Sequence, residues 1–302
     1  MAYIMIKNTV SQHVERKKLD GFYIEALSIG KHKNNPELNE DGFVATSHTF
    51  AVIDGSAPRT PVKFLGSSSA QFATNVLKKV LATTPPSLNG SELVTVITGR
   101  LNEDVDKVGA RDTITQTPEA RPAALFTVAR IHNGKLVITA LGDIHCRVNG
   151  QMVHTDRIIT EDLMIEKRIA AMNKAALQNQ TFSDDEFRTL GRAAIDEDLK
   201  TQVRSYFNNP DDPLGLGIID GEDVSKKFIR TYQFDLPDVQ TLEIFSDGYY
   251  VIPEEPSIDA FEQAFSEAER EDPLRWKKYP AVKASTPDQF SDDRTILIAK
   301  AI

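Results

Sequence analysis

Short runs of apolar and β-branched residues, each bounded by turn-forming residues, recur along most of the chain. Runs of this length and composition predict β-strands. Asn133-Gly134 separates two of them, and this dipeptide favours the tight turn of a hairpin. The predicted strands cover residues 23–29, 42–46, 49–53, 125–131, 135–141, 148–154, 228–234, 241–245 and 295–301.

Helical spacing of apolar residues replaces this pattern in two stretches after the early strands, at residues 67–82 and 91–108. One of the serines at 67–69 is expected to cap the first of these helices. A later helix is predicted over residues 257–269, with a serine at its start. Strands first, then two helices, then more strands and a late helix indicate an α+β fold with central sheets and outer helices.

The middle of the chain differs from its surroundings. Residues 160–207 are charged and helical in pattern, with few β signals, and Ser183-Asp184-Asp185-Glu186 matches a capping box that starts a helix. A run of Asn, Asp and Pro at 208–213 ends this stretch. We therefore expect one domain, residues 1–302, that carries a helical insertion at about residues 160–212.

The hairpin predicted from strands 42–46 and 49–53 places two acidic residues opposite each other. Its two-residue connection is Ser47-His48, so opposed positions share a constant sum. That register opposes Asp41 and Asp54 at the open end of the hairpin. Two carboxylates in this position repel each other unless a cation or proton lies between them. The pair is therefore expected within reach of a common metal site.

Further short acidic motifs border other predicted strands. An isolated Asp-Gly is most often a solvated turn, but antiparallel pairing of strands 241–245 and 295–299 would bring Asp247 and Asp292 to one sheet edge. Carboxylate oxygens are the ligands that Mg²⁺ and Mn²⁺ prefer. The five motifs are Asn39-Glu40-Asp41-Gly42, Asp54-Gly55, Gly142-Asp143, Ser246-Asp247-Gly248 and Asp292-Asp293-Arg294-Thr295.

Composition excludes several classes of protein. The 302 residues are 40% hydrophobic, which is ordinary for a soluble globule. No apolar run approaches the ~18 residues that a membrane span requires, and no secretory signal is recognised at the start. The net charge of −9 argues against nucleic-acid binding. The single cysteine, Cys146, permits no internal disulfide and fits a reducing, cytoplasmic compartment.

The five acidic motifs, in this order and strand context, resemble those of the metal-dependent protein serine/threonine phosphatases of the 2C type, in their bacterial style. The resemblance spans residues 23–302. It implies a four-layer α-β-β-α sandwich with two central antiparallel β-sheets and a helical flap insertion. It also implies that Mn²⁺ or Mg²⁺, as two ions with a third in some members, supports hydrolysis of phosphoserine and phosphothreonine in a phosphoprotein partner.

The resemblance assigns roles to particular positions. Asp54 would bridge two ions, and Asp54 and Asp247 would act in catalysis through metal-bound water. Asp143 matches a position linked to a third ion. The full set of implied metal ligands is Asp41, Asp54, the carbonyl of Gly55, Asp247, Asp292, Glu40 through water, and Asp143 for the third ion.

Two family features are missing. The segment that follows Asp54-Gly55 has no histidine to protonate a leaving group, and the phosphate-binding arginine has no match. Lys31, Lys33 or Arg59 could replace that arginine at the substrate phosphate. These departures leave two alternatives open: a catalytically weak or inactive family member that binds phosphoproteins as a regulatory module, or another two-metal phosphoester hydrolase.

Overall fold

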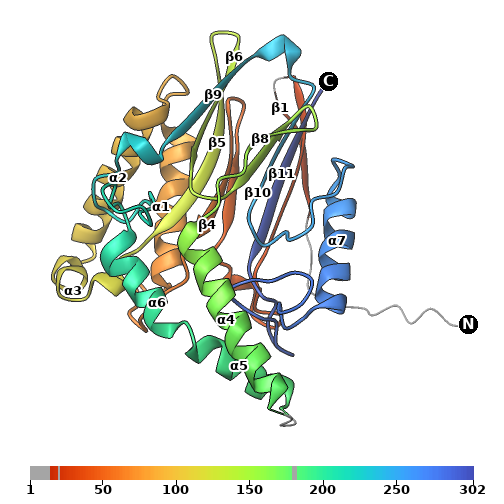
Figure 1. Cartoon of the computed structure of the whole chain (residues 1–302). Coiled ribbons are helices and arrows are strands. Elements are labelled where there is room, and N and C mark those ends of the chain that lie inside the picture. Colours follow the sequence, from red (N-terminus) through yellow and green to blue (C-terminus); the bar gives the residue numbers. More distant parts are fainter. Residues whose placement is uncertain (1–13, 20, 179–181) are drawn as a thin grey trace, which may run out of the picture.

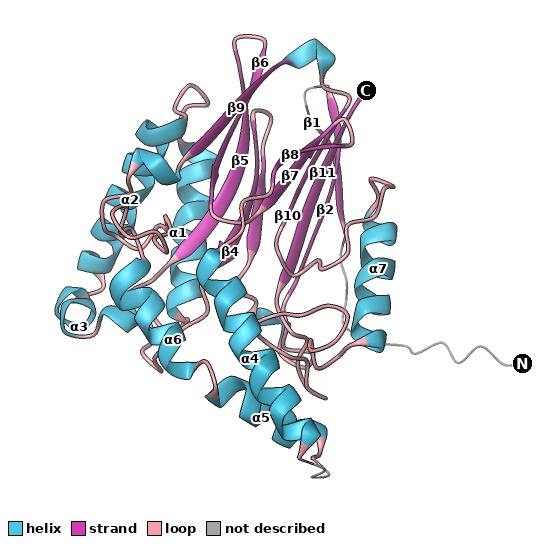
Figure 2. Cartoon of the chain, viewed as in Figure 1, coloured by secondary structure: helices cyan, strands magenta, loops and turns pink. Residues whose placement is uncertain are grey.

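Two antiparallel β-sheets form the centre of the computed structural model, which describes residues 14–19, 21–178 and 182–302 (Figures 1 and 2). The six-stranded sheet has the order β1 (Glu15–Leu19), β2 (Phe22–Ile29), β11 (Arg294–Ala301), β10 (Thr241–Phe245), β7 (His145–Val148) and β8 (Gln151–His154). The five-stranded sheet has the order β3 (Gly42–Ala45), β4 (Thr49–Gly55), β5 (Ala124–His132), β6 (Lys135–Leu141) and β9 (Arg230–Asp235).

Helices cover the outer face of each sheet. Figure 1 shows α1 (Ser69–Thr83) and α2 (Gly90–Lys107) on one side and α7 (Ile258–Glu271) on the other. A buried apolar cluster joins α1 and α2 to the five-stranded sheet, and a second joins α7 to the six-stranded sheet. A third cluster fills the space between the two sheets. The predicted four-layer α-β-β-α sandwich is therefore confirmed.

The alternation of side chains along each strand explains the layers. In β4, Ala51 and Ile53 pack toward the helices, whereas Phe50 and Val52 pack toward the other sheet. Successive residues of a strand point to opposite faces. Because both faces of both sheets are covered, the central strands are apolar at nearly every position rather than at every second one.

Capping explains where two of the predicted helices begin. The Ser68 hydroxyl accepts a hydrogen bond from the Gln71 backbone, and the Gln71 side chain bonds back to the Ser68 backbone, which starts α1. Ser183 and Glu186 make the same reciprocal pair and confirm the predicted capping box. Such a box satisfies two of the free N–H groups at a helix start.

The middle of the chain is helical, as expected, but in more pieces. Its elements are α4 (Ile159–Leu177), α5 (Asp184–Ala193), α6 (Asp196–Thr201) and a π-helical turn (Gln202–Tyr206). We call residues 159–206 the helical segment. No helix among the described residues is long and apolar enough to cross a membrane.

The prediction of one strand over residues 148–154 is wrong. Asn149 and Gly150 both have positive φ, 51° and 75°, and turn the chain between β7 and β8. Asn-Gly favours this tight hairpin geometry. The strand predicted at 228–234 begins at Arg230 instead, because residues 226–228 form a 3₁₀ turn. Strand β1 and helix α3 (Arg111–Gln116) were not predicted.

Candidate metal centre

Strand register brings the predicted acidic residues to one edge of the sandwich. In the β3–β4 hairpin, Gly42 pairs with Ile53, so the next residues outward, Asp41 and Asp54, are opposed as predicted. In the other sheet, Phe245 pairs with His145. If this register is continued by two residues beyond each strand end, Asp247 lies opposite Asp143. Acidic side chains from both sheets therefore lie at the same end of the molecule.

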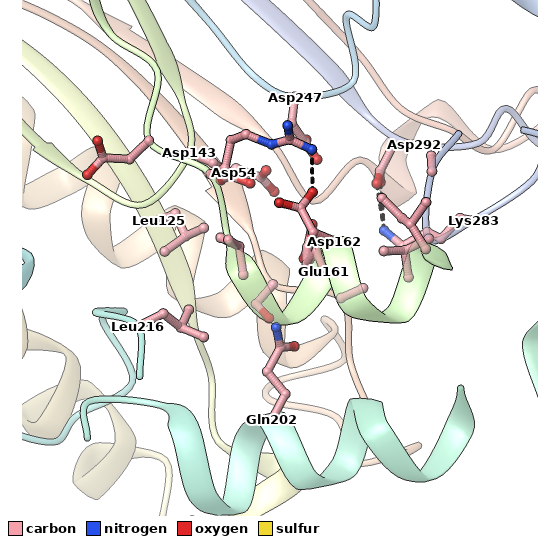
Figure 3. Close-up of a pocket in the computed structure, with 18 of the residues that line it drawn as sticks. Asp54, Leu125, Asp143, Glu161, Asp162, Gln202, Leu216, Asp247, Lys283 and Asp292 are labelled. Carbon is pink, nitrogen blue, oxygen red and sulfur yellow. Dashed lines mark hydrogen bonds and ion pairs between the residues drawn. The ribbon is translucent and has the colours of Figure 1, made fainter. Parts of the chain in front are cut away.

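Asp54, Asp143 and Asp247 line a cavity of about 410 Å³ between the sheet edge and the helical segment. Figure 3 shows the carboxylates of the sheet edge and that of Glu161, from the first turn of α4, around this space. The acidic side chains of its wall are Asp54, Asp143, Asp156, Glu161, Asp162, Asp247 and Asp292.

Three of the carboxylates are close enough to share one cation. Ligand oxygens of Asp143, Glu161 and Asp247 lie within 4.8 Å of one another. Oδ1 of Asp143 is buried and has no hydrogen-bond partner among the described residues. A buried polar atom without a partner is costly unless something else satisfies it. An all-oxygen set of this kind fits a hard divalent cation such as Mn²⁺ or Mg²⁺.

Burial and mutual repulsion raise the pKa of most of these carboxyls. Burial raises the pKa of Asp54 well above its usual range, and the charges of Asp41 and Asp247 raise it further. Burial, followed by the neighbouring acids, raises the pKa of Asp247 to about 6 and that of Glu161 to about 7. A positive charge in the cavity would therefore stabilise the ionised site.

Asp41 and Glu40 lie behind the cavity and are fixed by hydroxyl groups. The Ser246 hydroxyl donates to Oδ2 of Asp41 at 2.9 Å and accepts from the Thr295 backbone at 2.9 Å. Glu40 accepts hydrogen bonds from the Ser68 hydroxyl and from Lys31, both at 2.7 Å. Neither acidic residue contributes to the cavity wall.

Gly55 allows the β3–β4 hairpin to pack closely against Glu40, behind the cavity. A Cβ at this position would be 2.4 Å from the Glu40 carbonyl oxygen and 3.0 Å from the Thr74 hydroxyl. The Thr74 hydroxyl already donates to that carbonyl at 2.6 Å. Only glycine fits this close approach of two backbones.

Two lysines neutralise part of the acidic edge. Lys283 donates to both carboxylate oxygens of Asp292, and Lys31 pairs with Asp293 and with Glu40. Of the two candidates in the last acidic motif, Asp292 lines the cavity and Asp293 does not. Lys283 was not predicted, because it lies in an irregular loop before β11 that has no recognisable pattern.

The three candidate phosphate contacts are in different places. Arg59 lines the cavity, and its buried Nε has no hydrogen-bond partner in the described part of the chain. Lys33 does not line the cavity, because its ammonium donates to the carbonyls of Thr286 and Pro287. With Lys31 held by carboxylates, Arg59 is the candidate that the structure brings to the site.

Comparisons with known proteins give structural matches only. No family model and no curated protein matches this chain. The serine/threonine phosphatase PstP/Ppp of Mycobacterium tuberculosis is 12% identical with a TM-score of 0.46, over 93% of this chain and 98% of that one. Serine-threonine phosphatase 2C of Toxoplasma gondii is 13% identical with a TM-score of 0.49, over 96% and 98%. RsbX in complex with magnesium is 11% identical with a TM-score of 0.40, over 96% and 100%.

Proposed function

We propose that this chain is a metal-dependent phosphatase of the 2C type that removes phosphate from phosphoserine and phosphothreonine in proteins. The observation that carries this proposal is the set of carboxylates around one cavity, supplied by both sheets and by α4. Burial and repulsion make this set unfavourable without positive charge, as the raised pKa values of Asp54, Asp247 and Glu161 reflect.

The residues at the sheet edge would hold the cations. Asp54 and the Gly55 carbonyl, Asp247 and Asp292 would hold two ions, with Asp41 and Glu40 acting from behind. Asp143 would hold a third ion, and Glu161 lies close enough to Asp143 and Asp247 to contribute a ligand. Mn²⁺ or Mg²⁺, when bound, would lower the pKa of a coordinated water and screen the charge of the phosphate.

Other residues of the chain would position the substrate. Arg59 extends from the loop after β4 to the cavity wall, where one terminal nitrogen donates to the Ala57 carbonyl and the buried Nε has no partner among the described residues. A guanidinium in this setting fixes the orientation of a phosphate by directed hydrogen bonds. His145 lines the cavity, but burial lowers the pKa of its ring to about 4, so it would be neutral near pH 7. Leaving-group protonation is therefore assigned to water.

A binding module without strong catalysis is the second candidate. It is favoured by Lys283, because an ammonium on both oxygens of Asp292 neutralises one of the residues that would bind a cation. Another two-metal phosphoester hydrolase would share the same cavity, and it is separated from the proposed function by its substrates.

Hydrolysis of p-nitrophenyl phosphate and of a phosphoserine peptide, each with Mn²⁺ or with chelator, tests the proposal. We expect turnover of both substrates that requires the metal. Metal-dependent hydrolysis of the aryl phosphate and of a bis-aryl phosphodiester, but not of the peptide, would indicate another hydrolase. No turnover of any of them, with tight binding of the phosphopeptide, would indicate the binding module.

A further inference from the structure

A second, smaller pocket lies next to the acidic cavity and has the opposite charge. It has a volume of about 220 Å³, and no acidic side chain of the described residues lines it. Val282 and Lys283 belong to the walls of both pockets, so the two adjoin. The basic side chains of its wall are Lys31, Arg168, Arg188, Arg192 and Lys283.

The arginines come from α4 and α5, and residues 282–291 form the opposite wall. Figure 1 shows α4 running beside the blue loops that connect α7 to β11. Arg168 is buried, and its guanidinium donates to the carbonyls of Leu274, Arg275 and Ala281 rather than to any carboxylate of the described residues. Arg168 therefore carries a positive charge into the wall that is hydrogen-bonded to carbonyls and interacts with the carboxylate of Asp272 only through its charge.

The other two arginines are more accessible. The Arg188 side chain is 16% exposed; one terminal nitrogen pairs with Asp185, whose side chain is 82% exposed, and its Nε donates to the Ser285 carbonyl at 2.5 Å. Arg192 is 48% exposed and pairs with Asp196 in the same segment. Exposed pairs of this kind contribute little and exchange readily for a better partner. The Arg192 guanidinium is thus available to an anion that enters the pocket, as is the second terminal nitrogen of Arg188, which makes no hydrogen bond within the described residues.

We propose that this pocket binds a second anionic group of the substrate, either another phosphate or a carboxylate side chain, while the phosphate to be removed lies in the acidic cavity. This inference rests on the proposed function and names its substrate class: a phosphopeptide with a neighbouring acidic or phosphorylated residue. Clustered guanidinium groups recognise phosphate and carboxylate by paired, charge-assisted hydrogen bonds.

Binding to the full chain in chelator tests the pocket without any turnover. The probe is inorganic phosphate, and the variant is Arg188→Gln/Arg192→Gln. The matched control is Lys167→Gln/Lys200→Gln, which removes two exposed charges from the same helical segment but outside this pocket. We expect affinity to fall about fivefold or more in the arginine variant and to stay unchanged in the control. Equal affinity in all three proteins, or no binding by the unsubstituted chain, would overturn the proposal.

Peptides with Mn²⁺ present then distinguish the two anion sources. The three peptides have one phosphoserine in common. They differ at one of the next four positions, which is serine, glutamate or a second phosphoserine. A gain in kcat/KM for the glutamate peptide shows recognition of a carboxylate, and a gain only for the diphosphorylated peptide shows recognition of phosphate. The arginine variant should lose about fivefold of that preference, and the lysine control should keep it. A preference that survives in the arginine variant would contradict the assignment, whereas failure of all turnover would affect only the proposed function.

Discussion

Lys283 donates to both carboxylate oxygens of Asp292, at 2.8 and 2.7 Å, where the sequence places a metal ligand. Burial alone would raise the pKa of Asp292, but the ammonium groups of Lys283 and Lys31 outweigh it and lower that pKa. The chain therefore supplies its own counter-ion at one side of the cavity. A cation that binds to Asp292 has to compete with this ammonium for the carboxylate oxygens.

Replacing Lys283 by methionine should make divalent cations bind more tightly. The variant removes a competing positive charge and keeps the length of the side chain, so we expect Mn²⁺ affinity to rise roughly tenfold. In chelator the same variant should unfold at a lower temperature, because Asp292 loses its partner. Isothermal titration with Mn²⁺ and thermal unfolding measure the two effects.

Lys278→Met is the matched control for this prediction. Lys278 is 60% exposed, pairs with Glu271 and lies away from the cavity. The Lys278→Met variant should change neither the Mn²⁺ affinity nor the response of the melting temperature to metal. Weaker metal binding by Lys283→Met would mean that the lysine supports the cation site instead of competing with it.

The metal-free protein should lose stability as the pH rises. Glu161 and Asp247 have pKa values of about 7 and about 6 in the folded chain, chiefly because they are buried. In the unfolded chain these carboxyls release their protons near pH 4. Between these values the folded state binds more protons than the unfolded state. The contribution of these two carboxyls to the free energy of unfolding is therefore fully present below about pH 4. It is lost as the pH rises through about 7.

Thermal unfolding in chelator measures this dependence. We expect the melting temperature to fall by roughly 5 °C or more between about pH 5 and about pH 7.5. Excess Mn²⁺ should reverse the trend, because the cation binds the ionised carboxylates. Glu161→Gln removes one titrating group and should flatten the slope in chelator. An unchanged slope in that variant would show that Glu161 has an ordinary pKa.

Gly55→Ala tests the close approach between the hairpin and the residues behind the cavity. The added methyl group would meet the Glu40 carbonyl at 2.4 Å and the Ala70 side chain at 3.0 Å. We expect a loss of about 1–3 kcal/mol in the free energy of unfolding, because the crowded backbones have to separate. Urea unfolding in chelator measures this loss apart from metal binding.

Gly99→Ala is the control for Gly55→Ala. Gly99 lies within α2, and apart from its chain neighbours and the backbone of its own helix, no atom of the described residues is within 4 Å of the position of its added methyl group. Alanine is the better helix former, so this variant should gain up to about 1 kcal/mol. Equal effects of the two substitutions would show that Gly55 is not required by the packing.

The sequence predicted the parts of the site that local pairing determines. The connection at Ser47-His48 fixes the register of the β3–β4 hairpin, so the opposition of Asp41 and Asp54 follows from counting along two adjacent strands. The pairing of β10 with β11 was also expected, because both strands are rich in apolar residues, although Glu243 lies in the middle of β10. Sheet-edge aspartates near turns are visible in the sequence whenever the strands beside them are.

The remaining parts depend on contacts between distant segments. Glu161 belongs to a charged helix, and only the packing of α4 beside the sheet edge brings it to Asp143 and Asp247. Lys283 lies in a loop with no periodicity. Lys33 was a plausible phosphate contact in the sequence, but the fold directs its ammonium to two carbonyls outside the cavity. Charge alone does not reveal which way a surface lysine points.

Asp54→Asn should separate the metal site from the fold. The change keeps the shape of the side chain and removes a carboxyl whose ionised form is disfavoured by burial and by the charges of Asp41 and Asp247. We expect a higher melting temperature in chelator, a smaller rise on adding Mn²⁺, and phosphatase activity lower by about 100-fold or more. Asp220→Asn, at another buried aspartate outside the cavity, should keep its response to Mn²⁺. Full activity in Asp54→Asn would exclude Asp54 as a ligand.

Anomalous diffraction from a crystal soaked in Mn²⁺ tests the central claim most directly, because it locates the ions without relying on turnover. The account predicts at least two manganese peaks in the acidic cavity. One should lie in contact with Asp54, and the others should be bound by side chains among Asp143, Glu161, Asp247 and Asp292, with Lys283 moved away from Asp292. A soaked crystal with no peak in this cavity, or with manganese only on surface carboxylates elsewhere, would contradict it.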